Sequence, residues 1–191
     1  MDNLVDARGM GCPKPVICTK KALEEIKSGV LTTIVDNDIA KDNVIRLANS
    51  FDYPVEVEKK EDNYYIRIKK ENVMLEEIDS GRDIAVLVSS QYIGKGNDEL
   101  GRVLAKSFFF TLTETYPLPK TIIFINSAII LTCEGSHVLE EIIQLEKQGV
   151  EILSCGTCLD YYQVKDKLCV GSISNMYTIV EKMYNNKLIS V

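Results

Sequence analysis

The stretch Gly11-Cys12-Pro13-Lys14-Pro15 decides how the first part of this chain folds, because it separates a short strand from a helix. The strand is predicted at Leu4–Ala7. A helix is predicted to follow and to end near Gly29, since apolar or small side chains recur at helical spacing at Val16, Thr19, Leu23 and Ile26. Proline is tolerated in a first helical turn, where its missing N–H would have no intrahelical partner. Cys12 is therefore expected at or beside the N-cap.

The position of Cys12 favours chemistry over packing. A helix N-terminus and the nearby charge of Lys14 both favour the thiolate, although Pro13 and Pro15 remove two of the N–H groups that would contribute, so we expect a moderate effect. The alternative is that Cys12 is a small buried hydrophobe. Inert cysteines are typical of apolar runs, whereas this one lies between Gly11 and Pro13, which favours a functional thiol.

Composition indicates an ordinary globular protein. The chain has 191 residues, of which 46% are hydrophobic and 26% charged. Residues 1–70 carry 12 basic against 12 acidic side chains and residues 71–191 carry 10 against 16. Neither half has an excess of basic residues, which weakens the hypothesis of nucleic-acid binding. No signal peptide or membrane span is predicted, and the expected location is cytoplasmic. In a reducing compartment, the six cysteines are interpreted as thiols for redox, transfer or metal chemistry rather than as disulfides.

The first segment, residues 1–70, predicts a two-layer βαβαββ sandwich. Apolar residues such as Val57 and Ile66 alternate with charged ones on either side of Asp62-Asn63. This alternation indicates a hairpin with one solvent-exposed face. A second helix is expected from Asp38, with its apolar stripe on the same side of the sheet as that of the first helix.

In the second segment, residues 83–191, predicted strands and helices alternate as in an α/β domain. Residues 71–82 are predicted to link the two segments. Uninterrupted apolar runs at Ile84–Val88 and Ile122–Ile125 are typical of a parallel sheet covered by helices on both faces. Helices are expected at about 99–115, 136–148 and 175–186, and strands near 83–88, 121–131, 150–154, 168–172 and 188–190.

The carboxyl ends of these strands predict a rim that gathers Cys133 and the stretch Cys155-Gly156-Thr157-Cys158 in a loop. The two-residue spacing suits a redox or sulfur-handling pair, and it also suits half of a zinc site that Cys133 could join. Cys169 is expected in a strand that points it away from the rim. Inert thiols are the remaining alternative.

Other features have more ordinary interpretations. Gly94-Lys95-Gly96 is read as a turn before an N-cap at Asn97 or Asp98, since the spacing of a phosphate loop is missing. His137 is expected to be solvated or to cap a helix. Cys18 is expected to pack. Because Phe108-Phe109-Phe110 cannot all face one core from a helix, at least one ring is expected to reach a second surface.

The motif at Gly11–Pro15 resembles the signature of the TusA/SirA family of small sulfur carriers, over residues 1 to about 70. In that family the motif cysteine carries sulfur as a persulfide, which maps to Cys12. The second segment resembles the DsrE/DsrF-like sulfur-relay family, some members of which accept sulfur on a rim cysteine; Cys155 and Cys158 are the matching candidates. The combination resembles the YedF-type family, which is associated with sulfur or selenium metabolism.

These resemblances imply a relay protein that takes sulfur or selenium from a donor such as a cysteine desulfurase and passes it to an acceptor protein. No cofactor or resident metal is expected, and DsrE-like domains commonly form homo-oligomers. Two other hypotheses remain open: a non-catalytic regulatory or RNA/protein-interaction module, and a redox or zinc switch at Cys155 and Cys158.

Overall fold

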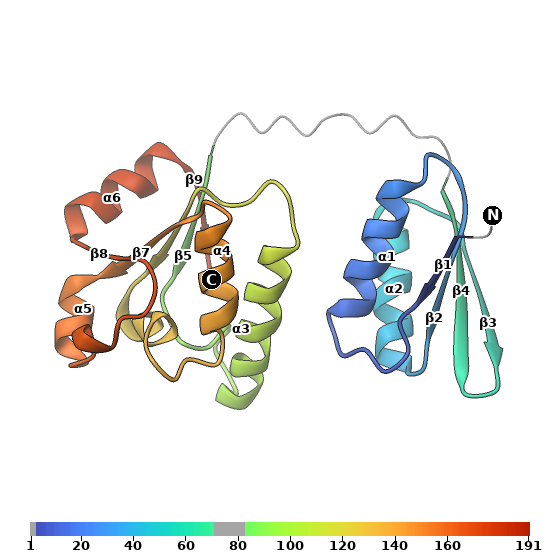
Figure 1. Ribbon diagram of the computed structural model, residues 1–191, viewed down its shortest axis with the longest axis horizontal. Coiled ribbons are helices and arrows are strands. Elements are labelled where there is room, and N and C mark those ends of the chain that lie inside the picture. The colour runs from blue at the N-terminus through green and yellow to red at the C-terminus, as the bar shows by residue number, and fades with distance from the viewer. Residues whose placement is uncertain (1–2, 71–82) are drawn as a thin grey trace. The chain divides into compact units, whose positions relative to one another are not determined.

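The computed structural model describes residues 3–70 and 83–191, so the predicted linker lies outside the described residues. The chain divides into two compact units, Met1–Glu77 and Ile78–Val191, and each is described by itself (Figure 1). Within the described residues, no helix is both long and apolar enough to cross a membrane.

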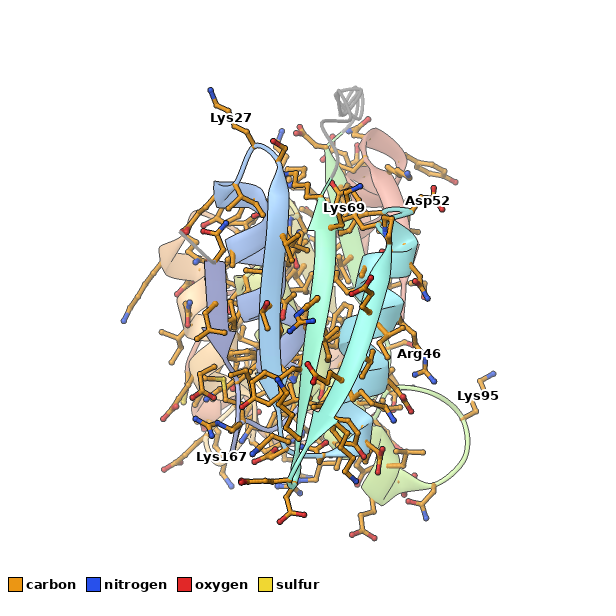
Figure 2. All side chains as sticks on the ribbon, turned by 90° about the vertical axis from the view of Figure 1, so that its right-hand side faces the viewer. Lys27, Arg46, Asp52, Lys69, Lys95 and Lys167 are labelled. Atoms are coloured by element: carbon orange, nitrogen blue, oxygen red, sulfur yellow. The ribbon has the colours of Figure 1, made fainter. Side chains whose placement is uncertain are left out.

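The first unit has the predicted βαβαββ order. Its elements are β1 (Asn3–Asp6), α1 (Lys14–Glu25), β2 (Gly29–Val35), α2 (Asp38–Ser50), β3 (Val55–Lys60) and β4 (Asn63–Lys70). The sheet runs β1-β2-β4-β3, with β1 parallel to β2 and the other pairs antiparallel. Both helices cover one face of the sheet in Figure 1, and Figure 2 looks onto the open face, where polar side chains such as Lys69 are exposed.

The core of this unit lies between the sheet and its two helices. Leu31, Ile66 and Ile68 from the strands and Val44 from α2 are completely buried. The Asn37 side chain caps α2 by accepting the Ala40 N–H at 2.8 Å, which fixes where that helix begins.

The hairpin turn was predicted one residue too late. Lys60 pairs with Asn63, so the turn residues are Glu61 and Asp62, and Glu61 takes the left-handed conformation at φ 53°. The strand pairing, rather than the turn propensity of individual residues, sets the register of the hairpin. The register decides on which face of the sheet Ile66 is buried.

The second unit is a five-stranded parallel sheet in the order β8-β7-β6-β5-β9. In chain order its elements, with 3-10 helices labelled η, are β5 (Ile84–Val88), α3 (Asp98–Thr113), β6 (Thr121–Phe124), η1 (Asn126–Thr132), α4 (Leu139–Lys147), β7 (Glu151–Cys155), α5 (Gly156–Tyr161), η2 (Lys165–Lys167), β8 (Ser172–Ser174), α6 (Met176–Asn185) and β9 (Lys187–Ser190).

Helices cover both faces of this sheet, as predicted (Figure 1). Side chains alternate between the faces along each strand, so Ile122 packs with Phe109 of α3 while Ile123 packs with Ile179 of α6. All four of these side chains are buried. The prediction of a mixed sheet followed by a parallel sheet is therefore confirmed.

Two predicted strands were misplaced. The strand expected over 121–131 ends at Phe124, because Asn126 adopts a positive φ of 52° and the chain turns into η1. The strand expected at 168–172 lies instead at Ser172–Ser174, just after Gly171. At Gly171, φ is +80° and a Cβ atom would lie 2.6 Å from the carbonyl oxygen of Ile152, so the strand starts only beyond this close approach.

Two other local predictions have clear outcomes. Asn97 is the N-cap of α3 and accepts the Leu100 N–H at 2.9 Å, which confirms the predicted cap. The stretch Cys155–Cys158 was predicted to be a rim loop, and this is wrong. Cys155 ends β7 and Gly156 begins α5 directly, so the two cysteines lie at a strand-to-helix junction.

Candidate functional site

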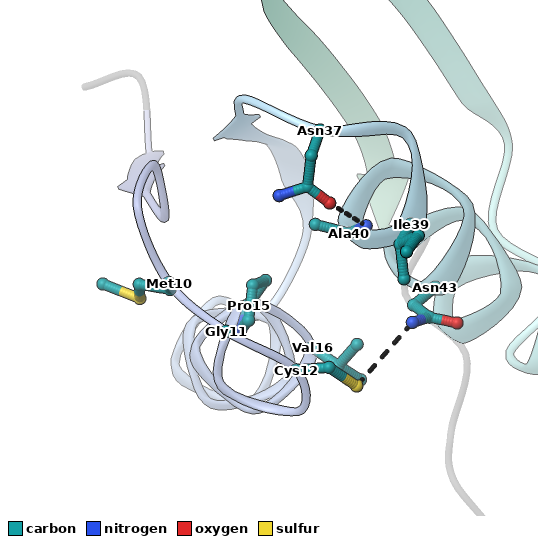
Figure 3. Close-up of a pocket in the computed structure, with 9 residues that line it drawn as sticks. All are labelled: Met10, Gly11, Cys12, Pro15, Val16, Asn37, Ile39, Ala40 and Asn43. Carbon is teal, nitrogen blue, oxygen red and sulfur yellow. Dashed lines mark hydrogen bonds between the residues drawn. The ribbon is translucent and has the colours of Figure 1, made fainter. Parts of the chain in front are cut away.

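Cys12 lies in the loop between β1 and α1, and its thiol is exposed. The loop and the facing ends of α1 and α2 form a surface pocket of about 180 Å³ (Figure 3). The residues that line it are Met10, Gly11, Cys12, Pro15, Val16, Asn37, Ile39, Ala40 and Asn43. The sulfur therefore lies where a second molecule can reach it.

The start of α1 is built by the two prolines. Pro13 is the N-cap residue, and Pro15 is buried in the first turn. The main-chain N–H of Lys14 donates to the Gly11 carbonyl at 3.0 Å, and that of Val16 donates to the Pro13 carbonyl at 3.1 Å. The helix starts where the sequence predicted, but these first-turn N–H groups are bonded within the chain rather than to the Cys12 sulfur.

The carboxylate of Asp36 anchors the loop between β1 and α1, which carries Cys12. Asp36, at the end of β2, accepts the Gly9 main-chain N–H at 2.6 Å and the Asn37 amide at 3.0 Å. The Gly9 N–H, and then the Asn37 side chain, lower the pKa of Asp36 below its usual value. The stabilising effect of this bonded carboxylate is present above the ordinary aspartate pKa and is lost as pH falls through the lowered one.

The partner of the Cys12 sulfur is Asn43 of α2, which the sequence analysis missed. Its Nδ2 donates to Cys12 Sγ at 3.8 Å (Figure 3). Asn43 lies one turn beyond Ile39, whose side chain is 70% exposed beside the pocket. The helical spacing of Ile39 and Asn43 was the available signal, but only the packing of α2 beside α1 shows that it concerns Cys12.

We expect Asn43 to tune the reactivity of Cys12. Replacing Asn43 with leucine, which has a similar size but no N–H, should slow alkylation of Cys12 about threefold to tenfold, since one hydrogen bond contributes about 1 kcal/mol. Iodoacetamide labelling at neutral pH, followed by peptide mass mapping, measures the rate. Asn49→Leu, at an exposed position of the same helix, is the matched control. Equal rates in both variants would rule out a role for Asn43.

In the second unit, Cys155 and Cys158 interact directly. Cys155 is 2% exposed at the end of β7, Cys158 is half-buried in α5, and both side chains belong to the apolar cluster around Ile179. Burial raises the pKa of Cys158, which the Asn126 N–H opposes and the Cys155 thiol reinforces. The sequence-predicted pair is therefore brought together.

Cys133, the third cysteine predicted at the rim, has different partners. Its buried Sγ donates to the carbonyls of Ile129 at 3.2 Å and Val164 at 3.8 Å, and burial raises its pKa. Across residues 3–70 and 83–191 no three His, Cys, Asp or Glu side chains are grouped so as to hold a metal. Cys169 is exposed and lies before β8, so the strand predicted to contain it is wrong there.

His137 differs from its prediction as well. α4 begins at Leu139 with Val138 as its N-cap, so His137 does not cap the helix. Its Nε2 is buried with no hydrogen-bond partner among the described residues. Burial, and then the nearby charge of Arg102, lower its pKa, which favours the neutral ring.

The pocket of the first unit contains one exposed thiol, that of Cys12, among its described lining residues. Residues 3–70 match the family model for "Sulfurtransferase TusA". The chain is 40% identical over 37 residues to the "Putative sulfur carrier protein YrkI" of Bacillus subtilis (strain 168), and it spans about half (49%) of that relative while the match covers 19% of this chain. The first unit is therefore similar in sequence to the TusA family over residues 3–70.

Solved structures are similar to parts of this chain. A SirA-like protein from Desulfitobacterium hafniense shares 40% identity, with 35% of this chain and 93% of that chain covered and a TM-score of 0.33. The ychN protein of E. coli shares 13% identity over 58% of this chain and 99% of its own, with a TM-score of 0.46. A protein of unknown function from Methanobacterium thermoautotrophicum shares 18% identity over the same fractions, with a TM-score of 0.42.

Proposed function

We propose that this protein is a sulfur or selenium relay in which Cys12 carries the transferred atom as a persulfide or its selenium analogue. The observation that carries the proposal is the exposed Cys12 thiol in an open pocket, inside the segment that matches a sulfurtransferase family. A thiolate at Cys12 attacks the terminal sulfur of a donor persulfide. The Cys12–sulfur bond forms, the donor sulfur–sulfur bond breaks, and the donor leaves as a thiolate.

The surroundings of Cys12 suit repeated transfer between proteins. Met10, Val16 and Ile39 form an apolar border to the pocket, and such a border favours contact with a protein surface. Asn43 donates to the Cys12 sulfur, which is the nucleophile on loading and the leaving thiolate on delivery. The donor is expected to be an enzyme such as a cysteine desulfurase, and the acceptor a sulfur- or selenium-handling protein.

Intact mass spectrometry tests the persulfide directly. The protein isolated without reductant, or incubated with a desulfurase and cysteine, should carry an adduct of about 32 Da that maps to the Cys12 peptide and disappears with dithiothreitol. An adduct that maps only to other cysteines would contradict the proposal.

We further propose that residues 83–191 form a DsrE-like domain that self-associates. Leu100 and Val103 are exposed on α3, the helix that carries the half-buried Phe108 and Phe110, and this apolar surface supports an interface with a second copy. Light scattering of the full chain at tens of micromolar should give a multiple of the 21.5 kDa monomer mass. A monomer mass would contradict self-association.

A further inference from the structure

Cys155 and Cys158 differ in their accessibility. Cys155, the first cysteine of the pair, is almost completely buried at the end of β7. Cys158, the second, is a half-buried residue of α5, so it is more exposed than Cys155. An incoming sulfur compound must reach the thiolate that attacks it. Of the two residues, Cys158 is therefore the better candidate for the thiol that meets an incoming compound, and Cys155 for the thiol that acts second.

A main-chain donor holds the Cys158 sulfur. The N–H of Asn126 points at Cys158 Sγ from 3.1 Å, which is short for a bond to sulfur. Asn126 adopts a positive φ of 52°, and its Oδ1 accepts the Tyr162 hydroxyl at 3.0 Å. Tyr162 in turn donates its main-chain N–H to the Cys158 carbonyl. This arrangement fixes the sulfur, and the Asn126 N–H opposes the rise that burial causes in the pKa of Cys158.

We propose that the second unit releases sulfide: Cys158 accepts a sulfane sulfur atom, and Cys155 then displaces that atom as hydrosulfide by forming a disulfide with Cys158. The two thiols pack in one apolar cluster, so the resolving thiol is already beside the persulfide that it attacks. The inference deepens the proposed relay and rests on it only for the source of the sulfane sulfur.

The chemistry balances in two steps. In the first, the Cys158 thiolate attacks the terminal sulfur of a persulfide R–S–SH, and R–S⁻ leaves. In the second, the Cys155 thiolate attacks Cys158 Sγ, the bond from Sγ to the outer sulfur breaks, and HS⁻ leaves. The sulfane sulfur gains two electrons, and the cysteine pair is oxidised to a disulfide. A small thiol or dithiol reductant returns the pair to its starting state.

Cys133 is poorly suited to replace Cys155 in this step. Its thiol donates to the carbonyls of Ile129 and Val164. Cys155 is also joined to Cys158 by only two intervening residues, which lets the sulfurs approach each other. Gly156 is one of these two residues, and a Cβ atom there would lie 3.0 Å from the Ile173 side chain. The junction is therefore packed closely against β8.

The test uses the full chain carrying Cys12→Ser, so that the first unit cannot take part. The reduced protein is mixed with glutathione persulfide, free hydrosulfide is trapped with monobromobimane, and the protein is weighed intact. About one hydrosulfide per chain should appear, and the protein mass should fall by about 2 Da as the disulfide forms. Release without disulfide formation would overturn the inference.

Two further variants in the same background separate the roles of the cysteines. With Cys155→Ser, an adduct of about 32 Da should remain on Cys158, and hydrosulfide release should slow at least tenfold. With Cys158→Ser, both the adduct and the release should fall to background, whereas the matched control Cys133→Ser should behave like its parent. Parental release from Cys155→Ser, or parental loading of Cys158→Ser, would overturn the proposal.

Asn126 is assigned as a positioning residue, and rescue by glycine tests this. Asn126→Ala disfavours the positive φ and should slow loading of Cys158 about tenfold, while Asn126→Gly keeps both the conformation and the N–H and should stay within about threefold of the parent. Equal loss in both would contradict the main-chain role. Because Cys12 is absent throughout, failure of these tests leaves the proposed role of Cys12 untouched, and the reverse also holds.

Discussion

Cys12→Ser is expected to reduce sulfur loading of the first unit to less than about one hundredth of the wild-type rate. A serine hydroxyl does not form a persulfide, and Cys12 is the one cysteine among the described residues that line the pocket. The stability of the unit should change by less than about 1 kcal/mol, because the Cys12 side chain is exposed and its hydrogen bond with Asn43 is long. Transfer of label from ³⁵S-cysteine by a desulfurase measures the loading, and thermal unfolding measures the stability.

The matched control is Cys18→Ser, on the same helix. Cys18 is half-buried and is not among the residues that line the pocket, so its variant should load at the wild-type rate. Label that still maps to the peptides of the first unit in Cys12→Ser would contradict the carrier role of Cys12.

The loop that carries Cys12 could be predicted because its determinants are local. Pro13 and Pro15 favour a helix start through their own backbone geometry, and the apolar residues of α1 have helical spacing. Asn43 could not be predicted in the same way. It is 31 residues from Cys12 and meets the sulfur only because α1 and α2 pack on the same face of the sheet.

In the second unit, the apolar runs of β5 and β6 indicated a buried parallel sheet, yet they did not show where β6 ends. Apolar residues continue beyond Phe124 into η1, so hydrophobicity alone does not distinguish the strand from the helix that follows. α5 has only six residues, too few for a periodic pattern. The relative burial of Cys155 and Cys158 depends on this junction and therefore required the structure.

For the run Phe108–Phe110, in contrast, partial burial could be predicted from the sequence. A helix can bury only part of such a run in one core. Phe109 is completely buried and stacks on Phe124 with ring centroids 5.9 Å apart, whereas Phe108 and Phe110 are half-buried. Phe109→Ala should therefore cost about 3–5 kcal/mol, through lost burial and the cavity left behind. The melting temperature of the second unit should fall by about 10 °C or more.

Calorimetry of the full chain measures this effect, with Phe110→Ala as the control that should cost clearly less. Sulfur loading of the same Phe109→Ala variant tests whether the two units are independent. The first unit has its own core around Leu31 and Ile66, so sulfur loading of Cys12 at 20 °C should be unchanged in Phe109→Ala even where the second unit has begun to unfold. Loss of Cys12 loading in Phe109→Ala would show that the first unit depends on the second for its stability. An equal loss of unfolding free energy in Phe110→Ala would contradict the assignment of Phe109 as the core ring.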